Sequence, residues 1–272
     1  MSEIWLITGA TSGFGRLVAR RALDRGAHVI AVGRRAELLG QLAAGTPAGS
    51  RITPVVLDVT APDAQSTLSA AIETAGGLDV LVNNAGYGLF GAVEQINDAE
   101  ARTAFETNVL ANLTVLRAAL PALRASRGRI VQMSSMNGQY AWASSGLYSA
   151  VKGAVELFTE ALAAELEPTG VRVTLIEPGV YGTGFQTSLH VIMPDEVYAP
   201  TVGKFLSDFS QLPPSAFGNP EEVADAIVSV VTMDEPPLRL PVGKDAVDAI
   251  RASLRSRLAE LEKWAPTEAV TA

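Results

Sequence analysis

Residues 8–15 read Thr-Gly-Ala-Thr-Ser-Gly-Phe-Gly, and they separate two segments of different character. Residues 4–7 before them form an apolar run typical of a buried strand, and residues 16–25 after them read as a helix. The spacing G-x-x-x-G-x-G lets backbone N–H groups approach a pyrophosphate at the start of that helix. A glycine-rich loop alone also fits a tight structural turn, but its position between a strand and a helix favours a nucleotide-binding loop.

Beyond this loop, short apolar runs alternate with longer segments that read as helices. The further apolar runs lie at residues 27–32, 55–57, 78–82, 129–133 and 171–176. The helical segments between them lie at residues 36–44, 63–74, 98–125 and 147–167. This order predicts an α/β fold: a doubly wound parallel sheet of the Rossmann-like type, covered by helices on both faces in a three-layer αβα arrangement.

The alternation stops after residue 176. Residues 178–219 carry five prolines and five glycines, and we expect a substrate lid at about residues 184–218. A helix at 221–231, a short strand at 238–240 and a charged final helix at 245–264 follow. No linker or internal repeat is visible, so residues 1–272 are predicted to form a single dinucleotide-binding and catalytic domain.

The composition excludes several classes of site and partner. The chain of 272 residues has a formal net charge of −8 and no cysteine, which argues against disulfides and thiolate metal sites. His28 and His190 are far apart, so we predict no metal site; His28 is expected at the surface. An acidic chain is a poor binder of nucleic acid or anionic membranes. No stretch reads as membrane-spanning or as a signal peptide, and we expect a cytoplasmic protein.

The end of the second predicted strand bears on the choice of cofactor. It reads Gly33-Arg34-Arg35, at the distance from the glycine loop where a dinucleotide-binding fold selects its ribose. An acid there would hydrogen-bond a free 2′-hydroxyl, whereas arginine suits a 2′-phosphate. The sequence therefore favours NADP(H) over NAD(H). The alternative is that both arginines are solvated charges at a helix start.

Tyr148 and Lys152 are four residues apart in a helical segment, so they share one helix face. A free tyrosine is a weak acid and a poor proton donor at neutral pH, and a neighbouring cation moves its pKa toward the working range. Ser135 follows the fifth predicted strand, at the sheet edge where such folds bind ligands. Its hydroxyl is placed to hydrogen-bond a substrate oxygen.

These residues together make the chain resemble the short-chain dehydrogenases/reductases, in their single-domain branch, over residues 4–183. Residues 8–15 resemble the T-G-x-x-x-G-x-G loop of that family, and residues 83–86 read Asn-Asn-Ala-Gly, the family's N-N-A-G. Ser135 stands 13 residues before Tyr148, and Tyr-x-x-x-Lys is the hallmark motif. The C-terminal part is similar to the steroid- and retinol-dehydrogenase-like carbonyl reductases, which hints at a hydrophobic substrate.

The resemblance implies a catalytic set of Asn108, Ser135, Tyr148 and Lys152. Tyr148 would act as general acid or base on the substrate oxygen, and Ser135 would hold that oxygen. Lys152 would lower the pKa of Tyr148 and bind the nicotinamide ribose, and Asn108 would hold a relay water. The residues expected to contact the cofactor are Gly9, Thr11, Ser12, Gly13, Phe14, Gly15, Arg34, Arg35, Asp58, Val59, Asn84, Ala85, Gly86, Tyr148, Lys152, Pro178, Gly179 and Thr183.

The predicted function is NADP(H)-dependent interconversion of a ketone or aldehyde and an alcohol by hydride transfer. Candidates for the lining of the substrate pocket are Tyr140, Trp142, Tyr181 and Phe185. One alternative is a catalytically silent nucleotide-binding regulator on the same fold, although such proteins commonly lose the Tyr or the Lys. Another is an epimerase or dehydratase with retained cofactor, although those relatives usually have a larger C-terminal domain.

The resemblance also implies a homodimer or a higher homo-oligomer. The helices at residues 98–125 and 147–167 are expected to pair with their copies in a second subunit. The first offers Leu110, Leu113 and Leu116 at roughly helical spacing.

Overall fold

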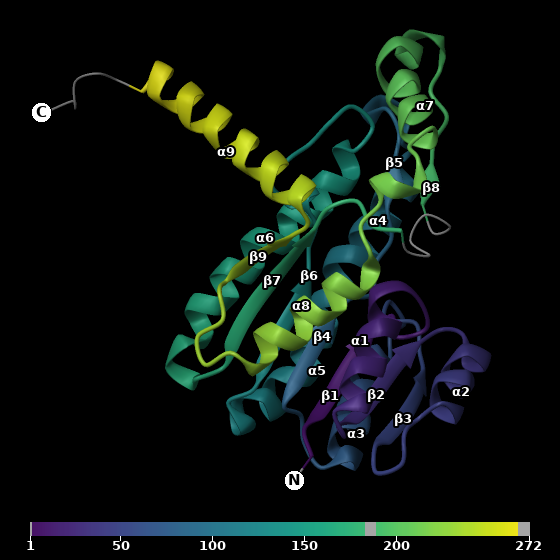
Figure 1. The fold of residues 1–272 in the computed structure, drawn as a ribbon, viewed down its shortest axis with the longest axis vertical. Helices are drawn as coiled ribbons and strands as arrows, with labels where there is room; N and C mark the ends of the chain where they lie inside the picture. The colour runs from purple at the N-terminus through teal and green to yellow at the C-terminus, as the bar shows by residue number, and fades with distance from the viewer. Residues whose placement is uncertain (1, 183–188, 266–272) are drawn as a thin grey trace, which may run out of the picture.

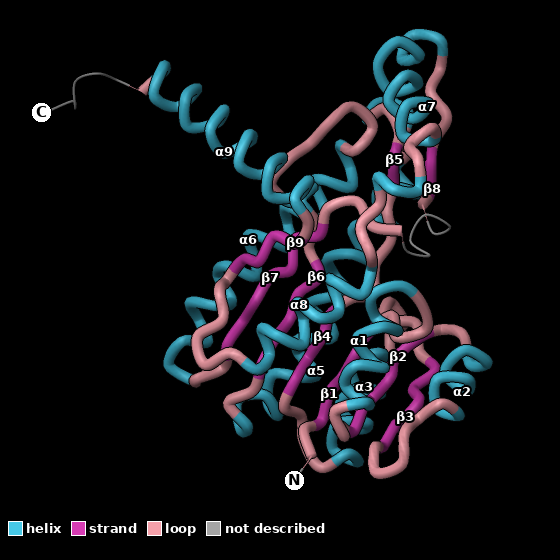
Figure 2. Tube along the Cα trace, viewed as in Figure 1, coloured by secondary structure: helices cyan, strands magenta, loops and turns pink. Residues whose placement is uncertain are grey.

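The computed structural model of the protein describes residues 2–182 and 189–265. Within these residues, seven parallel strands form one sheet in the order β3-β2-β1-β4-β6-β7-β9 (Figures 1 and 2). The strands are β1 (Ile4–Thr8), β2 (His28–Gly33), β3 (Arg51–Val56), β4 (Val80–Asn83), β6 (Arg129–Met133), β7 (Arg172–Pro178) and β9 (Arg239–Val242). The order reverses direction between β1 and β4, which is the point where doubly wound sheets bind their ligands.

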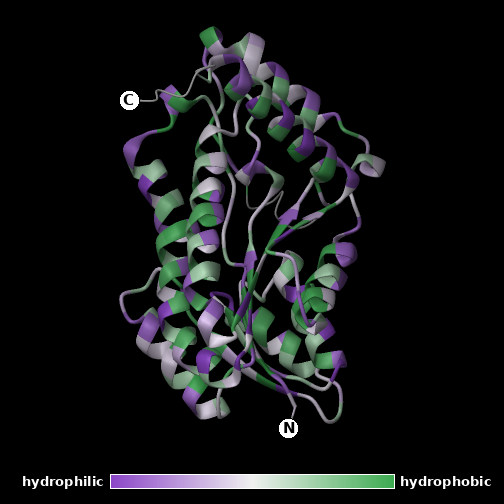
Figure 3. Ribbon diagram, turned by 90° about the vertical axis from the view of Figure 1, so that its left-hand side faces the viewer, coloured by the Kyte–Doolittle hydropathy of each residue, from purple (hydrophilic) through white to green (hydrophobic). Residues whose placement is uncertain are grey.

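Helices cover both faces of this sheet and produce three layers, which Figure 3 shows edge-on. The helices are α1 (Gly13–Asp24), α2 (Ala36–Ala44), α3 (Ala64–Ala75), α4 (Asp98–Phe105), α5 (Ala111–Ser126), α6 (Gly146–Leu166), α7 (Lys204–Ser210), α8 (Pro220–Thr232) and α9 (Lys244–Trp264). Helices α1 and α8 pack on one face, and α3, α5 and α6 pack on the other. The predicted doubly wound αβα fold is confirmed.

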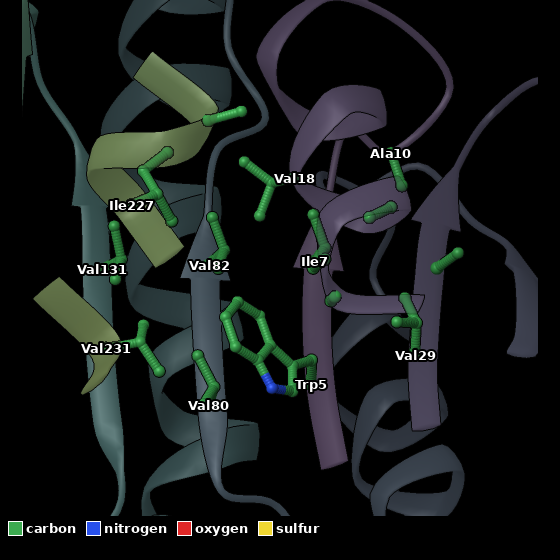
Figure 4. Packing of buried hydrophobic residues seen from close by; sticks show 14 of the residues in the cluster. Trp5, Ile7, Ala10, Val18, Val29, Val80, Val82, Val131, Ile227 and Val231 are labelled. Carbon is green, nitrogen blue, oxygen red and sulfur yellow. The ribbon is translucent and has the colours of Figure 1, made fainter. Parts of the chain in front are cut away.

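The strand β1 illustrates why continuous apolar runs form the centre of this sheet. Successive side chains of a strand point to opposite faces, so Trp5 and Ile7 enter one core and Leu6 enters the other. All three are fully buried. Figure 4 shows the first core, where Trp5 lies beside Val80 and Val82 of β4, and Ile227 and Val231 of α8 belong to the same cluster. A strand covered on both sides needs apolar residues at every position.

Three details differ from the sequence-based expectations. The third strand starts at Arg51, several residues before the predicted run at 55–57, because edge strand β3 is half exposed and contains polar residues. His28 was expected at the surface but is buried, and its Nε2 lies 2.8 Å from the Thr53 hydroxyl of β3. The helix expected at 98–125 is interrupted by a π-helical turn, Glu106–Leu110, between α4 and α5.

The segment predicted as a lid lies beyond the carboxyl ends of the central strands (Figure 1). Its described part, residues 189–218, is more regular than its composition suggests. It contains α7 and the short strand β8 (His190–Val191), which pairs in parallel with β5 (Leu89–Phe90). Thr183 and Phe185 lie outside the described residues. No helix in the described part of the chain combines the length and the apolar character needed to cross a membrane.

Candidate active site

The glycine loop connects β1 to α1 in a conformation that needs glycine. Gly9 and Gly13 have φ angles of +69° and +51°, in the left-handed region that other residues rarely adopt. A side chain at Gly15 would bring its Cβ within 2.5 Å of the Gly9 carbonyl oxygen. The first turn of α1, after Ser12, contains no acidic residue. The result is a cradle of backbone N–H groups at a helix N-terminus, which fits a pyrophosphate.

The segment after β4 is fastened to this loop by hydrogen bonds. The Thr8 hydroxyl oxygen accepts the backbone N–H groups of Asn84 and Ala85, both at 2.9 Å. The Asn84 amide in turn donates to the Thr8 carbonyl oxygen at 2.9 Å. These bonds bring the Asn-Asn-Ala-Gly motif of residues 83–86 against the start of the loop, across the point where the strand order reverses.

Of the two arginines after β2, Arg35 contacts the glycine loop and Arg34 lies near Asp58. Arg35 donates a hydrogen bond of 3.0 Å to the Thr11 hydroxyl, and the Arg34 guanidinium lies 3.6 Å from the Asp58 carboxylate. Gly33 has no room for a side chain here, because a Cβ would lie 2.6 Å from Thr11 Cγ2. The Arg34 side chain is 78% exposed, so its guanidinium is accessible to a ligand.

Asp58 and Val59 follow β3 at the same end of the sheet. Hydrogen bonds from Thr60, chiefly from its backbone N–H, hold the pKa of Asp58 below its ordinary value, and Arg34 contributes in the same direction. Asp58 is therefore ionised at neutral pH and attracts the Arg34 guanidinium. Val59 is buried.

Helix α6 brings Tyr148 and Lys152 to the carboxyl end of β6, where Ser135 lies. Tyr148 is buried and hydrogen-bonded to Ser135. The Lys152 ammonium donates to the Met133 carbonyl oxygen at 2.8 Å and lies 5.8 Å from the centre of the Tyr148 ring. The Ser135 oxygen also accepts the backbone N–H of Asn137 at 3.2 Å, which fixes its position. Three of the four residues predicted to be catalytic thus meet at one point.

The electrostatics of this cluster are dominated by burial. Removal from water raises the pKa of Tyr148 to about 12, against a smaller opposing effect of the Ser135 hydrogen bond. Burial also lowers the pKa of Lys152 to about 8, against the opposing charge of Glu156 one helical turn further on. The expected lowering of the Tyr148 pKa by Lys152 is therefore not visible in the protein alone. In a dry site, burial disfavours the charged form of both groups.

Asn108, the fourth residue of the predicted catalytic set, lies in the π-helical turn between α4 and α5. Such turns are frequent at functional sites because they reorient a side chain within a helix. Its side-chain oxygen accepts the backbone N–H of Tyr87 at 3.2 Å, and its carbonyl oxygen accepts the Asn112 amide at 2.6 Å. A Cβ on Gly86 would lie 2.6 Å from the Asn108 oxygen and 3.9 Å from Lys152 Nζ, so Gly86 allows this close approach.

A cavity of about 540 Å³ opens in front of Tyr148. Its wall joins Ser135, Tyr148 and Lys152, but not Asn108, to the described part of the lid segment and to the end of β7, at Pro178 and Gly179. The apolar part of the wall consists of Phe14, Phe90, Met133, Met136, Trp142, Val180, Tyr181, Leu189, Val191, Met193, Phe205, Leu206 and Phe209. Of the described side chains that line it, only Lys152 carries a charge.

The family model described as short chain dehydrogenase matches residues 3–191. The chain belongs to the short-chain dehydrogenase/reductase family. It is therefore an oxidoreductase by family, as the motifs of its glycine loop and of residues 148–152 predicted.

Its relatives in this family extend over nearly the whole chain. An oxidoreductase of Botryotinia fuckeliana, BOA17, is 36% identical over 269 residues and covers 97% of both chains. A solved short-chain dehydrogenase from Streptomyces avermitilis is 37% identical, with a TM-score of 0.89 over 97% of this chain and 96% of that one. A short chain dehydrogenase from Burkholderia cenocepacia, solved in complex with NADP, is 26% identical, with a TM-score of 0.74 over 97% and 98% of the two chains.

The structure of this short-chain dehydrogenase adds residues that sequence reasoning missed. The Phe90 ring lies 5.3 Å from the Tyr148 ring, yet Phe90 belongs to a two-residue strand that no periodicity reveals. Of the predicted pocket candidates, Trp142 and Tyr181 line the cavity, whereas Tyr140 packs its ring on Trp142 at 5.5 Å. His190 is exposed and lies 3.1 Å from the Glu100 carboxylate, outside the cavity wall. Within the described residues, no three histidine, aspartate or glutamate side chains gather closely enough to hold a metal ion.

Proposed function

We propose that this protein is an NADP(H)-dependent oxidoreductase that interconverts a ketone or aldehyde and the corresponding alcohol. The observation that carries the proposal is the position of Tyr148. It is hydrogen-bonded to Ser135 at the wall of a cavity that Lys152 and the segment after β7 also line. A proton donor, a second hydroxyl and a cation thus converge where a carbonyl group would enter.

Each of these groups has a distinct task in carbonyl reduction. Tyr148, protonated at neutral pH, donates its proton to the substrate oxygen, and Ser135 hydrogen-bonds that oxygen as negative charge develops. Lys152 stabilises the phenolate that Tyr148 becomes and binds the nicotinamide ribose. The bound nicotinamide supplies or accepts the hydride. Asn108 holds a water on the path by which Tyr148 regains its proton.

The cofactor fits the residues that surround the switch point of the sheet. The glycine cradle at the start of α1 suits a pyrophosphate, and Asp58 and Val59, which follow β3 at the same end of the sheet, would contact the adenine ring. Arg34 and Arg35 flank the place of the ribose, which favours a 2′-phosphate and hence NADP(H). The neighbouring structure from Burkholderia cenocepacia in complex with NADP supports this choice.

The substrate that the cavity favours is neutral and predominantly apolar. Among the described residues of the wall, Lys152 carries the only charge, and it faces Tyr148, so these residues leave no cation to bind a carboxylate or sulfonate on the substrate. The rings of Trp142, Phe205 and Phe209 follow one another at 5.5 and 6.0 Å. This aromatic wall suits an aliphatic or aromatic ketone or aldehyde.

The proposal includes a homo-oligomer in which α4–α5 and α6 pair with their copies in a second subunit. Leu110 is 48% exposed and Leu157 of α6 is 71% exposed, which supports pairing of α4–α5 and α6 with a second subunit. Leu116, expected at the same surface, is 3% exposed and belongs to the core beneath the sheet. The proposed interface therefore excludes Leu116.

The test is consumption of NADPH or NADH, followed at the nicotinamide absorbance, with a panel of ketones and aldehydes. We expect turnover of neutral apolar carbonyls with NADPH and little turnover of substrates that carry a carboxylate. Tight NADPH binding without turnover of any carbonyl in either direction would favour a nucleotide-binding regulator. Product formation without net change in NADPH would favour an epimerase or dehydratase with retained cofactor.

A further inference from the structure

Helix α9 has two halves with different surroundings. In its first half, Ala246 and Ile250 are buried and pack with Met136 and Trp142 of the active-site region. The Ser253 hydroxyl donates to the Gln139 carbonyl oxygen at 2.8 Å, and beyond this contact the helix projects away from the body of the protein (Figure 1).

The projecting half exposes large apolar side chains. Leu254, Leu258 and Leu261 are 50%, 54% and 64% exposed. With about 100° of rotation per residue, these three leucines lie within about 60° of arc on one side of the helix. We call them the apolar stripe. The stripe continues the buried side of α9 past the point where the body of the protein ends.

Charged residues lie to either side of the stripe, and the sign of their charge changes along the helix. Arg255 and Glu262 lie about 70° to 90° from the centre of the stripe on one side; on the other side Arg257 lies about 70° away, whereas Glu260 lies about 130° away and does not border the stripe. On the first side the basic residue comes first and the acidic residue second. In the described part of the chain, none of these four side chains forms an ion pair.

This pattern is complementary to itself in one orientation only. If a second copy of α9 packs in parallel, each arginine faces an arginine. If it packs antiparallel, with the two-fold axis near Leu258, Arg255 faces the copy of Glu262. In the same register Leu258 meets its own copy, and Leu254 meets the copy of Leu261. The apolar and the charged contacts therefore select the same arrangement.

We propose that α9 pairs antiparallel with α9 of a second copy of this chain through the apolar stripe. Such an isologous contact has the two-fold symmetry of most protein dimers. It lies on a different part of the chain from the proposed α4–α5 and α6 interface. Because a stripe of three leucines is smaller than a standard interface, we expect association in the micromolar range.

The pairing also concerns the active site, because α9 begins at its edge. The Asp245 carboxylate, in the first turn, accepts the backbone N–H of Val180 at 2.7 Å, and Val180 lines the substrate cavity. Ile250 packs near Trp142 and Met136, two further lining residues. A second copy bound to the projecting half would therefore restrain α9, whose first half packs against one wall of the cavity.

The chain contains no cysteine, so single cysteines report this contact without background. Leu258→Cys should form a covalent dimer on mild oxidation or with a short bis-maleimide. The matched control is Ala252→Cys, an exposed residue on the opposite side of α9. We expect cross-linking at least about tenfold faster for Leu258→Cys than for Ala252→Cys, since only the first thiol meets its copy.

Two further experiments test whether the two α9 helices run antiparallel. Leu254→Cys chains should not cross-link to one another but should cross-link to Leu261→Cys chains in a mixture. Arg255→Glu should raise the dissociation constant in sedimentation about tenfold, and adding Glu262→Arg to the same chain should restore it. All these positions are exposed, so melting temperatures should stay near that of the parent protein.

Several results would overturn the proposal. Equal cross-linking rates for Leu258→Cys and Ala252→Cys would do so, and so would efficient self-cross-linking of Leu254→Cys, which requires parallel helices. Failure of Glu262→Arg to restore association of Arg255→Glu would show that the flanking charges do not meet. Cross-linking of Leu258→Cys that depends on added phosphatidylglycerol vesicles would assign the stripe to a lipid surface instead.

Discussion

The Lys152 ammonium lies 5.8 Å from the centre of the Tyr148 ring, one turn further along α6, and both side chains are buried. Burial moves the pKa values of the two groups in opposite directions, to about 8 for Lys152 and about 12 for Tyr148. Each shift favours the neutral form. Near neutral pH, Tyr148 therefore keeps the proton that carbonyl reduction needs, and Lys152 is close to losing its charge.

The first prediction concerns the pH dependence of reduction. Lys152 is charged below its pKa of about 8, so kcat/KM for carbonyl reduction should fall as the pH rises past that value. The Glu156 carboxylate opposes the lowering of the Lys152 pKa, so Glu156→Gln should move this alkaline limb to lower pH. The measurement is kcat/KM from pH 6 to 10 with saturating NADPH.

The matched control for this prediction is Glu160→Gln. Glu156 and Glu160 both pair with Arg239, at 2.8 and 2.5 Å, but only Glu156 is one turn from Lys152. Glu160→Gln should therefore leave the alkaline limb where it is. Identical profiles for the parent protein and both variants would show that Glu156 does not act on Lys152.

The second prediction concerns the choice of cofactor. Arg34→Ala removes an exposed guanidinium near Asp58 and should raise the KM for NADPH by about ten- to a hundredfold. The KM for NADH should change by less than about threefold, because NADH lacks the 2′-phosphate that Arg34 would contact. Arg35→Ala should act in the same direction and also free the Thr11 hydroxyl. Equal use of both cofactors by the unmodified protein would show that both arginines are surface charges without a role in the choice of cofactor.

The third prediction concerns inversion of that preference. An acid at position 33 should repel the 2′-phosphate, but a Cβ there would lie 2.6 Å from Thr11 Cγ2. Gly33→Asp alone should therefore be impaired with both cofactors. Gly33→Asp combined with Thr11→Ser removes the clashing methyl group and should favour NADH. Thr11→Ser alone is the control and should keep the NADPH preference; a double variant that still prefers NADPH would contradict this reading of the strand end.

The fourth prediction concerns the stability of the fold. Burial, and then the neighbouring Glu156 carboxylate, raise the pKa of Glu177 to about 7. The folded protein thus holds a proton that the unfolded chain releases near pH 4.5, so Glu177 makes stability fall as the pH rises from about 4.5 to 7. Glu177→Gln should remove this decline, which is of order 1 to 3 kcal/mol. Urea unfolding at several pH values measures it, with exposed Glu165→Gln as the control; an unchanged pH profile in Glu177→Gln would contradict it.

How much the sequence predicts depends on how local each feature is. The runs that include Trp5, Leu6 and Ile7 predict central strands because covered strands are apolar throughout. The 13-residue spacing from Ser135 to Tyr148 predicts their contact only through the resemblance to the short-chain dehydrogenases, which share this separation. His28 escapes prediction because its burial depends on Thr53 of a neighbouring strand.

Other features of the site are likewise beyond the reach of sequence patterns. The π-helical turn that holds Asn108 differs from an ordinary helix by one hydrogen-bond register, and no residue type marks it. Phe90 lies in β5, which pairs with β8 about a hundred residues further along the chain, and no local sequence pattern indicates this pairing. The electrostatics of Lys152 are set by burial, which the Tyr-x-x-x-Lys motif does not encode.

The central claim is that Tyr148 transfers the proton, and Tyr148→Phe tests it most directly because this change removes only the hydroxyl group. The decisive measurement is single-turnover reduction of a good substrate by the variant, together with NADPH binding followed by fluorescence. We predict that hydride transfer slows by about a hundredfold or more while the Kd for NADPH stays within about threefold. A variant that kept more than about a tenth of the parent rate, with the same NADPH affinity, would contradict the assignment of Tyr148 as the proton donor.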